Sequence, residues 1–505
     1  MRAIRSSTVD DVVRRSARRT PERVALRFAD RVWTYRELDD AVSRGAGMLL
    51  DLGLAKGDRV AAYGTNSDAY LVAFLAASRA GLVHVPINYN LKGDELSYLL
   101  EQSGSRAVLT DPKLVGRLDE LPARPEHVLA LRDDEGSLLA RVTSGAVPEI
   151  DVEVVETDLV QLLYTSGTTS RPKGAMMTHR ALVHEYVSCI HAMGCHATDE
   201  PLHPMPLYHS AGMHVLMLPY LAVGATNHLM ETPDVPEILR RVEQDGIGAL
   251  FLAPTVWVPL SNHPDFATRD LSSLRKAFYG ASIMPQPVLE RLQKALPDLG
   301  FYNLFGQSEI GPLATALQPD EHLERPDSCG RAVLFVELRV IDGDGNDVAP
   351  GELGEVVYRS PQLCEGYWEK PEETEEAFAG GWFHSGDLVR IDDQGFITVV
   401  DRIKDVINTG GVLVASREVE DALYTHPGVA EAAVIGTPDD RWIEAITAFV
   451  VLKDGAEVEE PELISHVKQR LAGFKVPKRA VVVDELPRNA SGKLLKRVLR
   501  DSLPD

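Results

Sequence analysis

Short apolar runs alternate with longer amphipathic stretches over the first 150 residues of the chain. Residues 59–63 and 82–86 have the length and composition of buried strands, and residues 69–80 between them follow a helical pattern. A strand, a helix and a second strand in this order predict a βαβ unit, in which helices cover a largely parallel sheet. Residues 160–164 and 248–305 repeat the pattern. We therefore expect an α/β fold of layered sheets and helices.

The pattern changes near residue 331, where alternating strands are joined by Asp-Gly turns. A chain of 505 residues is also too long for one ordinary core. We predict a large N-terminal domain of residues 1–400 and a small α+β C-terminal domain of residues 401–505. In the small domain the order helix, strand, strand, helix is expected at residues 416–425, 430–436, 446–452 and 460–471.

Charge and cysteine content exclude several classes of function. The chain has 75 acidic and 52 basic residues and a formal net charge of −23, so neither a nucleic acid nor an anionic membrane surface is an expected partner. No apolar run approaches the roughly 20 residues that a membrane-spanning helix needs. Four cysteines do not make a disulfide framework. We expect a cytoplasmic protein with no integral membrane association.

A run of hydroxyl and glycine residues follows the strand expected at residues 160–164. It reads Tyr-Thr-Ser-Gly-Thr-Thr-Ser-Arg-Pro-Lys-Gly over residues 164–174. Hydroxyl and backbone N–H groups can donate hydrogen bonds to phosphate oxygens, and Lys173 adds a positive charge. The run lacks the Gly-x4-Gly-Lys-Ser/Thr spacing of a Walker A loop. It predicts a phosphate-binding loop of another type.

As a complete string, residues 164–174 resemble the phosphate-binding signature of the adenylate-forming superfamily, which contains acyl-CoA synthetases, peptide-synthetase adenylation domains and beetle luciferases. Further similarities follow in order from Trp33 to Lys493, and the pattern is most similar to medium- or long-chain acyl-CoA synthetases. The resemblance implies an acid–thiol ligase with two half-reactions. ATP and a carboxylic acid would form acyl-AMP and pyrophosphate with Mg²⁺ present, and the acyl group would then pass to the thiol of coenzyme A.

The resemblance also implies which residues bind the nucleotide and act in catalysis. Ser308 would contact the α-phosphate, Glu309 would bind Mg²⁺ as a hard oxygen ligand, and Asp387 would accept hydrogen bonds from the ribose hydroxyls. Lys493 would stabilise the charge that grows as pyrophosphate leaves. The set implied for ATP and AMP is Thr165, Ser166, Gly167, Thr168, Thr169, Lys173, Gly280, Ala281, Ser282, Asn303, Phe305, Gly306, Gln307, Asp387 and Arg402.

An acyl pocket, a hinge and a thiol site follow from the same resemblance. Asp401 would be the hinge about which the small domain turns between two orientations. Coenzyme A would contact Gly410, Gly411 and Lys475, with Lys478 as a further basic candidate. The loop after Asp401 departs from the usual ligase pattern, so an amine or a carrier protein remains an alternative acyl acceptor. A homodimer is also an open alternative for the assembly. The residues implied for the pocket are His209, Gly212, Trp257, Gly306 and Gly311.

The class of acid is predicted from the segments that would line this pocket. Gly306 has no side chain that could close it, and residues 211–213, 253–257 and 310–313 are mainly apolar. These segments contain no arginine that could pair with a second carboxylate. In an apolar cleft each buried CH₂ adds about 0.8 kcal/mol of binding free energy. We therefore expect a medium-chain fatty or aryl acid as the substrate.

Overall fold

The computed structural model describes residues 7–165, 171–282, 284–410, 412–439, 441–453, 455–488 and 494–502. The chain forms two compact units. Unit 1 comprises Met1–Thr165, Pro172–Leu338 and Tyr358–Phe383, and unit 2 comprises Ser166–Arg171, Arg339–Val357 and His384–Asp505. The expected α/β class is confirmed, with a large N-terminal part of several sheets and a smaller C-terminal part. The domain boundary expected between residues 400 and 401 falls within unit 2. The hinge expected at Asp401 stays a prediction.

Within the described part of unit 1, nine strands form one sheet in the order β15-β14-β13-β12-β11-β9-β10-β1-β2. The four neighbouring strands β13, β12, β11 and β9 run parallel to one another. The bounds are β1 Val24–Phe28, β2 Arg31–Thr34, β9 Pro201–His203, β10 Asn227–Leu229, β11 Ala249–Phe251, β12 Lys276–Gly280, β13 Gly300–Phe305, β14 Thr315–Leu317 and β15 Arg331–Ala332.

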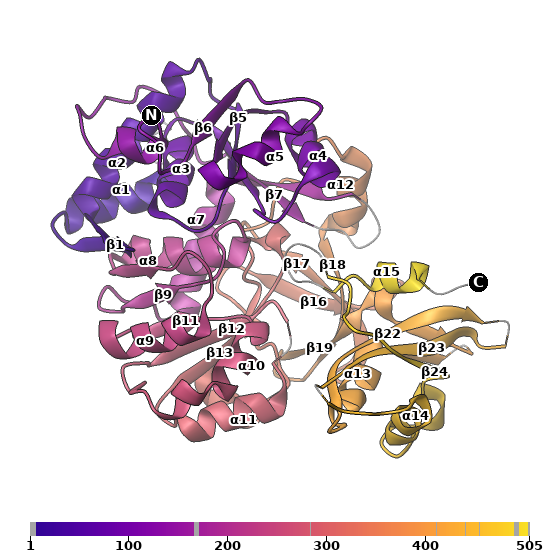
Figure 1. Ribbon diagram of the computed structural model, residues 1–505. Coiled ribbons are helices and arrows are strands. Elements are labelled where there is room, and N and C mark those ends of the chain that lie inside the picture. Colours follow the sequence, from indigo (N-terminus) through magenta and orange to yellow (C-terminus); the bar gives the residue numbers. More distant parts are fainter. Residues whose placement is uncertain are drawn as a thin grey trace. The chain divides into compact units, whose positions relative to one another are not determined.

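Three helices pack against the parallel part of this sheet: α9 (Val235–Asp245), α10 (Pro254–Asn262) and α11 (Gln286–Ala295). They lie together beside β11, β12 and β13 in Figure 1. Their apolar side chains recur at helical spacing, so each helix turns one stripe toward the sheet. The core that results contains Ile238, Leu239, Val242, Trp257, Leu260, Val288, Leu289 and Leu292 from the helices, with Leu250, Ala277 and Phe301 from the strands.

The second sheet of unit 1 has the strand order β6-β5-β3-β4-β7-β8 among the described residues. It contains the expected βαβ unit as β3, α3 (Asp68–Arg79) and β4, with β3 and β4 parallel, so this prediction is confirmed. The final strand, β8, runs antiparallel to β7, and the two flank the expected phosphate loop. The bounds are β3 Arg59–Tyr63, β4 Val83–Ile87, β5 Ser105–Thr110, β6 His127–Ala130, β7 Leu159–Thr165 and β8 Lys173–Thr178.

Helix α3 is buried along its whole length, because its sequence is apolar on every side. The charges at its two ends are paired within the fold. Asp68 accepts hydrogen bonds from Arg31 and Trp33, and Arg79 donates to Asp10. The other helices of unit 1 are α1 Val9–Arg19, α2 Tyr35–Asp51, α4 Gly93–Ser103, α5 Val115–Asp119, α6 Leu138–Val142, α7 His179–Met193, α8 Leu218–Val223 and α12 Pro371–Ala377.

Two further sheets account for most of unit 2. Strands β16 (Glu337–Ile341), β17 (Leu353–Arg359), β18 (Phe383–Ile391) and β19 (Ile397–Arg402) follow one another in the first, where the Asp-Gly turns were expected. The second has the order β21-β20-β23-β22, and β24 pairs with β23. Its bounds are β20 Ile407–Thr409, β21 Val412–Val414, β22 Val429–Asp439, β23 Ile443–Leu452 and β24 Arg479–Val482, with helices α13 Ser416–Tyr424, α14 Glu460–Lys468 and α15 Lys496–Asp501.

The α+β pattern expected beyond residue 401 is confirmed in kind and order. Helices α13 and α14 begin where they were expected, at residues 416 and 460, and α14 ends three residues before the expected end at 471. Both helices turn apolar residues toward the sheet, which forms a core with Val419, Leu423, Leu463 and Val467.

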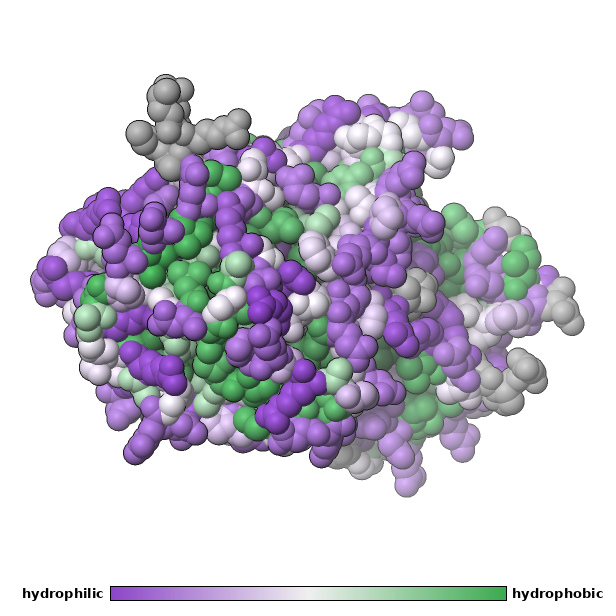
Figure 2. Space-filling model, turned by 90° about the horizontal axis from the view of Figure 1, so that it is seen from above, coloured by the Kyte–Doolittle hydropathy of each residue, from purple (hydrophilic) through white to green (hydrophobic). Residues whose placement is uncertain are grey.

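Hydrophilic side chains cover most of the face drawn in Figure 2, and hydrophobic ones form smaller areas between them. Among the described helices, none combines the length and the hydropathy that crossing a bilayer requires.

Candidate active site

The parallel strands of the nine-stranded sheet bring three of the expected site segments to one edge. Strands β9, β11, β12 and β13 are direct neighbours and point the same way, so their carboxyl ends meet at the same edge. The edge at the carboxyl ends of parallel strands is where open α/β sheets bind ligands. The expected residues that follow these strand ends are His209 and Gly212 after β9, Ala281 and Ser282 after β12, and Gly306, Gln307, Ser308 and Glu309 after β13.

Glu309 is held by hydroxyl groups from two other segments. Its Oε1 atom accepts hydrogen bonds from Thr165 Oγ1 at 3.0 Å and from the Tyr367 hydroxyl at 3.1 Å. Thr165 ends β7 in the six-stranded sheet, so this carboxylate joins the two sheets of unit 1. Within the described part of the chain no hydrogen bond ends on Oε2, which leaves a hard oxygen that suits Mg²⁺.

Tyr367 was missed by sequence reasoning, although it contacts two of the expected residues. The Lys173 Nζ atom lies over its ring, 5.2 Å from the centroid, while its hydroxyl bonds Glu309. The residue is placed by an antiparallel bridge to Ala175 in β8. A glycine and two aromatic residues in succession at 366–368 were the only sequence signal. Tyr367 therefore links the phosphate-loop lysine to the expected magnesium ligand.

The stem of the phosphate loop is anchored to α4 and to the segment around Trp368. Thr165 pairs with Lys173 across β7 and β8. The Tyr98 hydroxyl donates to the Pro172 carbonyl at 3.0 Å. Gln102 accepts a hydrogen bond from the Tyr164 hydroxyl and donates to the Trp368 carbonyl at 2.9 Å. These bonds fix both strands where the loop leaves the sheet.

Six of the expected residues lie outside the described part of the chain. They are Ser166, Gly167, Thr168 and Thr169 of the phosphate loop, Gly411 and Lys493.

The two motifs at the ends of β12 and β13 pack tightly against each other. Gly280 lies opposite Leu304, and a Cβ atom there would overlap the Leu304 carbonyl, so only glycine fits. Ala281 has a φ of 63°, a left-handed conformation that costs energy for a residue with a side chain. Asn303 donates to the Ser328 carbonyl at 2.9 Å, and the Ser308 and Ser210 hydroxyls lie 2.9 Å apart.

The surroundings of Gly306 differ from the expectation that its missing side chain leaves the acyl pocket open. A Cβ atom at this position would overlap the carbonyl oxygen of Pro312 and come within 2.8 Å of the Ala314 nitrogen. The space that a side chain would need is therefore filled by backbone, and a bulky residue here would displace Pro312 before it could shorten a pocket. Gly306 marks a close approach of two segments, and it does not mark the open end of a pocket.

The residues expected around the acid are divided between the core and the sheet edge. Trp257 is fully buried in the core of the helix layer, where its Nε1 donates to the Phe278 carbonyl at 3.1 Å. Gly212 is the second residue of a π-helical turn, Ala211–Met217, and a Cβ atom at Gly212 would overlap the Pro206 carbonyl. Such turns occur frequently at functional sites.

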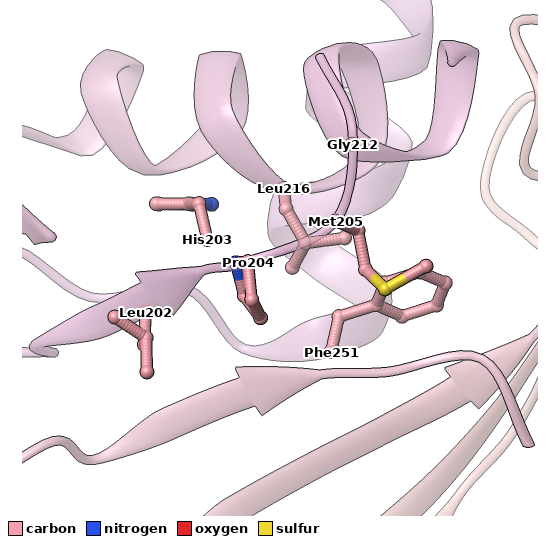
Figure 3. A pocket seen from close by; sticks show the side chains of 7 residues that line it. All are labelled: Leu202, His203, Pro204, Met205, Gly212, Leu216 and Phe251. Carbon is pink, nitrogen blue, oxygen red and sulfur yellow. The ribbon is translucent and has the colours of Figure 1, made fainter. Parts of the chain in front are cut away.

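A small cavity of ≈ 10 Å³ lies between this turn and the ends of β9 and β11, close to the space that one water molecule needs (Figure 3). Figure 3 shows the Met205 side chain beside the Phe251 ring, and Gly212 and Leu216 on the helical turn. The other lining residues are Leu202, His203 and Pro204. Its lining therefore combines polar atoms with apolar side chains, and the cavity is far smaller than a fatty or aryl acid.

In unit 2 the two residues expected at the ribose are paired with each other. Arg402 Nε lies 2.6 Å from Asp387 Oδ1, and the two residues face each other across β18 and β19. Asp387 is only 3% exposed, while Arg402 also donates to the Ser385 carbonyl at 3.3 Å. A ribose that binds to Asp387 would have to share this carboxylate with the guanidinium group.

The expected hinge residue Asp401 is tied to the start of α13. Its Oδ2 atom accepts hydrogen bonds from the Ser416 backbone nitrogen at 2.6 Å and from the Ser416 hydroxyl at 2.7 Å. Burial raises the pKa of Asp401, and the nearby Lys496 and the bonds from Ser416 oppose that rise. Any rotation at this residue therefore carries its side chain along with α13.

Gly410 and Lys478, two of the residues expected at coenzyme A, lie near the aromatic side chain of Trp442, which was not among the expected residues. The Gly410 nitrogen donates to the Trp442 carbonyl at 2.5 Å. Lys478 Nζ and the Arg441 guanidinium both lie 4.9 Å from the Trp442 ring centroid. Lys475 Nζ is paired with Glu418 at 2.6 Å. An aromatic ring with two cations close by is a combination that suits a phosphorylated nucleoside.

Comparison with known proteins shows family matches over both the N-terminal and the C-terminal parts of the chain. Residues 13–368 match the AMP-binding enzyme family, and residues 418–493 match the AMP-binding enzyme C-terminal domain. A feruloyl-CoA synthase of Amycolatopsis is 37% identical over 491 residues, 96% of this chain and 97% of the relative. A long-chain-fatty-acid–CoA ligase of Mycobacterium tuberculosis is 34% identical over 93% of this chain and 92% of its own. ATP-bound MatB from Rhodopseudomonas palustris has a TM-score of 0.89 at 29% identity and covers 98% of this chain and 99% of its own.

The first prediction concerns the hydroxyl that holds Glu309. Tyr367→Phe keeps the ring beside Lys173 and removes one hydrogen bond to the carboxylate, so ATP–pyrophosphate exchange should fall about tenfold. The Mg²⁺ concentration for half-maximal exchange should rise. Tyr35→Phe, which removes a buried hydroxyl bonded to the Ala225 carbonyl at 2.7 Å, is the matched control. Exchange at the wild-type rate with unchanged Mg²⁺ dependence in the Tyr367 variant would contradict the role.

Proposed function

Because the chain belongs to the AMP-binding enzyme family, as an AMP-forming acid–thiol ligase of the acyl-CoA synthetase type, we propose that it converts an aryl or medium-chain fatty acid to its coenzyme A thioester. ATP is the activating co-substrate. One observation carries the proposal: Glu309 at the sheet edge is held by Thr165 from the phosphate-loop stem and by Tyr367 beside Lys173. This arrangement gathers a carboxylate, a lysine and the loop stem where a triphosphate and its cation would bind.

In the first half-reaction a carboxylate oxygen of the acid attacks the α-phosphorus of ATP. A new oxygen–phosphorus bond forms, the bond to the β-phosphate oxygen breaks, and pyrophosphate leaves with its electron pair. Two anions must approach, so cations and hydroxyl donors aimed at the phosphate lower the barrier. We assign this work to Lys173, Ser308 and Lys493. A Mg²⁺ ion held by Glu309 would add positive charge beside the phosphates when bound.

In the second half-reaction the thiolate sulfur of coenzyme A attacks the acyl carbonyl carbon, and AMP leaves with the electrons of the carbon–oxygen bond. We assign the ribose contact to Asp387 and Arg402. We place the nucleotide end of coenzyme A at Trp442, where Lys478 and Arg441 lie close to the ring. Lys475 is already paired with Glu418, so it is the weaker candidate for a phosphate contact.

The proposed class of acid is supported by the apolar side chains around the sheet edge. Met205, Leu216 and Phe251 contribute apolar side chains there, beside a cavity that is itself too small to hold the acid (Figure 3). Apolar walls favour an acid with a hydrocarbon body, because each buried CH₂ contributes about 0.8 kcal/mol. One relative is named as a feruloyl-CoA synthase, which is an aryl-acid name, and another as a long-chain-fatty-acid–CoA ligase. We therefore retain both an aryl and a medium-chain acid.

The second prediction identifies the acid and the acceptor. In a panel of acids scored by pyrophosphate release, cinnamic-type acids and fatty acids of about eight to twelve carbons should exceed acetate by about a hundredfold in kcat/KM, because several CH₂ groups are buried. Parallel reactions with coenzyme A, simple amines and a phosphopantetheinyl carrier protein should yield product with coenzyme A alone. Preference for acetate would overturn the proposed acid, and amide or carrier product would overturn the proposed acceptor.

The third prediction separates the two half-reactions. Lys493→Ala should lower acyl-AMP formation by about a thousandfold, the scale on which one positioned charge acts in a transition state. It should leave thioester formation from supplied acyl-AMP within about threefold, because the lysine serves one orientation of the small domain. Lys468→Ala, at the exposed end of α14, is the control for loss of a lysine in the same part of the chain. Equal loss of both half-reactions would contradict the assignment.

The fourth prediction tests the coenzyme A platform. Trp442→Ala should raise the KM for coenzyme A about tenfold, because stacking of a base on an aromatic ring contributes about 1–3 kcal/mol. ATP–pyrophosphate exchange should stay unchanged. Tyr424→Phe, a change on α13 of the same unit, is the control. An unchanged KM for coenzyme A in a folded Trp442 variant would place the nucleotide elsewhere.

A further inference from the structure

The carboxyl group of Glu185 on α7 is fully buried, and its hydrogen-bond partners include the segment that follows Ser308 and Glu309. Among the described residues no lysine or arginine pairs with it, and burial raises its pKa to about 8. A buried acidic group is costly unless polar groups surround it. The residues that donate to Glu185 therefore indicate what the group is for.

Two of these donors come from distant parts of the chain. The Leu313 backbone nitrogen donates to Oε1 at 2.9 Å, and Gln362 Nε2 donates to Oε2 at 2.6 Å. Leu313 lies 128 residues beyond Glu185 in sequence, and Gln362 lies 177 residues beyond it. Cys189, one turn along α7, adds a weaker bond from Sγ at 3.2 Å. Each carboxylate oxygen therefore holds a different segment against the helix.

Gln362 binds the same segment from its other side. Its Nε2 atom also donates to the carbonyls of Leu313 at 3.0 Å and Ile310 at 3.3 Å, and its Oε1 atom accepts from the Ser188 hydroxyl at 2.6 Å. Three acceptors surround the amide nitrogen and one donor faces the amide oxygen. This arrangement fixes which way the amide points, because the reverse orientation would bring oxygen against oxygen.

The segment held in this way follows the two catalytic candidates directly. Residues 310–313 begin after Ser308 and Glu309, and the Cys364 nitrogen donates to the Glu309 carbonyl at 2.8 Å. A Cβ atom at Gly311 would come within 3.0 Å of Glu185 Oε2, so the segment packs closely on the carboxylate. The segment is irregular, and three of its backbone groups, the Leu313 N–H and the carbonyls of Ile310 and Leu313, find their partners in Glu185 and Gln362.

We propose that Glu185 and Gln362 form a buried carboxylate–amide brace that positions Ser308 and Glu309 for the adenylation half-reaction. The inference rests on the proposed function of those two residues. Glu185 and Gln362 touch neither substrate nor nucleotide, so both are positioning residues. Because the reacting groups must be held to a fraction of an ångström, a shift of residues 308–309 lowers the rate of acyl-AMP formation.

The chemistry of the pair supplies a near-isosteric test. In Glu185→Gln one carboxylate oxygen becomes an NH₂ group, which would face either the Leu313 nitrogen or Gln362 Nε2 as donor against donor. One of the two long-range bonds is then lost without any change of volume. Gln362→Met removes the amide group, and with it the bonds to Glu185, Ile310 and Leu313, at a similar side-chain volume. The bond from the Leu313 nitrogen to Glu185 stays.

The experiment measures both half-reactions in the full-length enzyme with an acid that the wild type accepts. ATP–pyrophosphate exchange by Glu185→Gln should fall about tenfold, and the Mg²⁺ concentration for half-maximal exchange should rise. Thioester formation from supplied acyl-AMP should change less than about twofold, which a general loss of folding would not produce. Gln362→Met should show the same split, and it keeps the test open if the Glu185 variant does not fold. Tyr35→Phe serves as the control for a lost buried hydrogen bond and should leave both rates unchanged.

Two results would overturn the brace: wild-type exchange in both variants, or a parallel fall of the two half-reactions that follows the loss of thermal stability. Failure of the proposed function has a different signature. In that case the wild type itself would show no acid-dependent exchange of pyrophosphate.

Discussion

The position of the Glu309 carboxylate is the constraint on which the rest of the candidate site depends. Thr165 reaches it from the six-stranded sheet, Tyr367 reaches it from the segment beside β8, and the residue itself follows the last parallel strand of the nine-stranded sheet. A charge-assisted hydrogen bond stabilises more than a neutral one. Two of them on one oxygen therefore fix the phosphate-loop stem relative to the edge where the strands end.

Close backbone packing around this carboxylate excludes side chains at several positions. Glycines at 212, 280 and 306 each lie where a Cβ atom would overlap a carbonyl oxygen of a neighbouring segment. Glu185 and Gln362 complete the arrangement from the buried side by pairing with the backbone of residues 310–313. The site is therefore built by backbone contact and by buried polar groups more than by apolar packing.

Unit 2 organises its charged groups by pairing them within the unit. Asp387 pairs with Arg402, Asp401 caps the start of α13 through Ser416, and Lys496 binds Glu420 at 2.8 Å. Each pair satisfies a group that would otherwise be costly to bury. A ligand that uses Asp387 or Arg402 competes with an existing partner, so its binding is coupled to the local geometry of β18 and β19.

The sequence by itself determined the order of elements and the class of chemistry. Apolar runs at 59–63 and 82–86 with a helix between them specify a βαβ unit, because side-chain periodicity is a local property. The strings at 164–174 and 303–309 carry their chemistry in consecutive residues, and for that reason a resemblance could be recognised in them.

The tertiary structure alone decided which side chains complete the site. Tyr367 lies 58 residues from Glu309, and Gln362 lies 177 residues from Glu185. No periodicity connects positions so far apart, and a buried glutamate looks in sequence like any glutamate on a helix. The same limit applies to Gly306, whose missing side chain suggested open space, whereas the carbonyl of Pro312 fills it. Sequence patterns record local preferences, while hydrogen bonds and close contacts between distant segments exist only after the chain has folded.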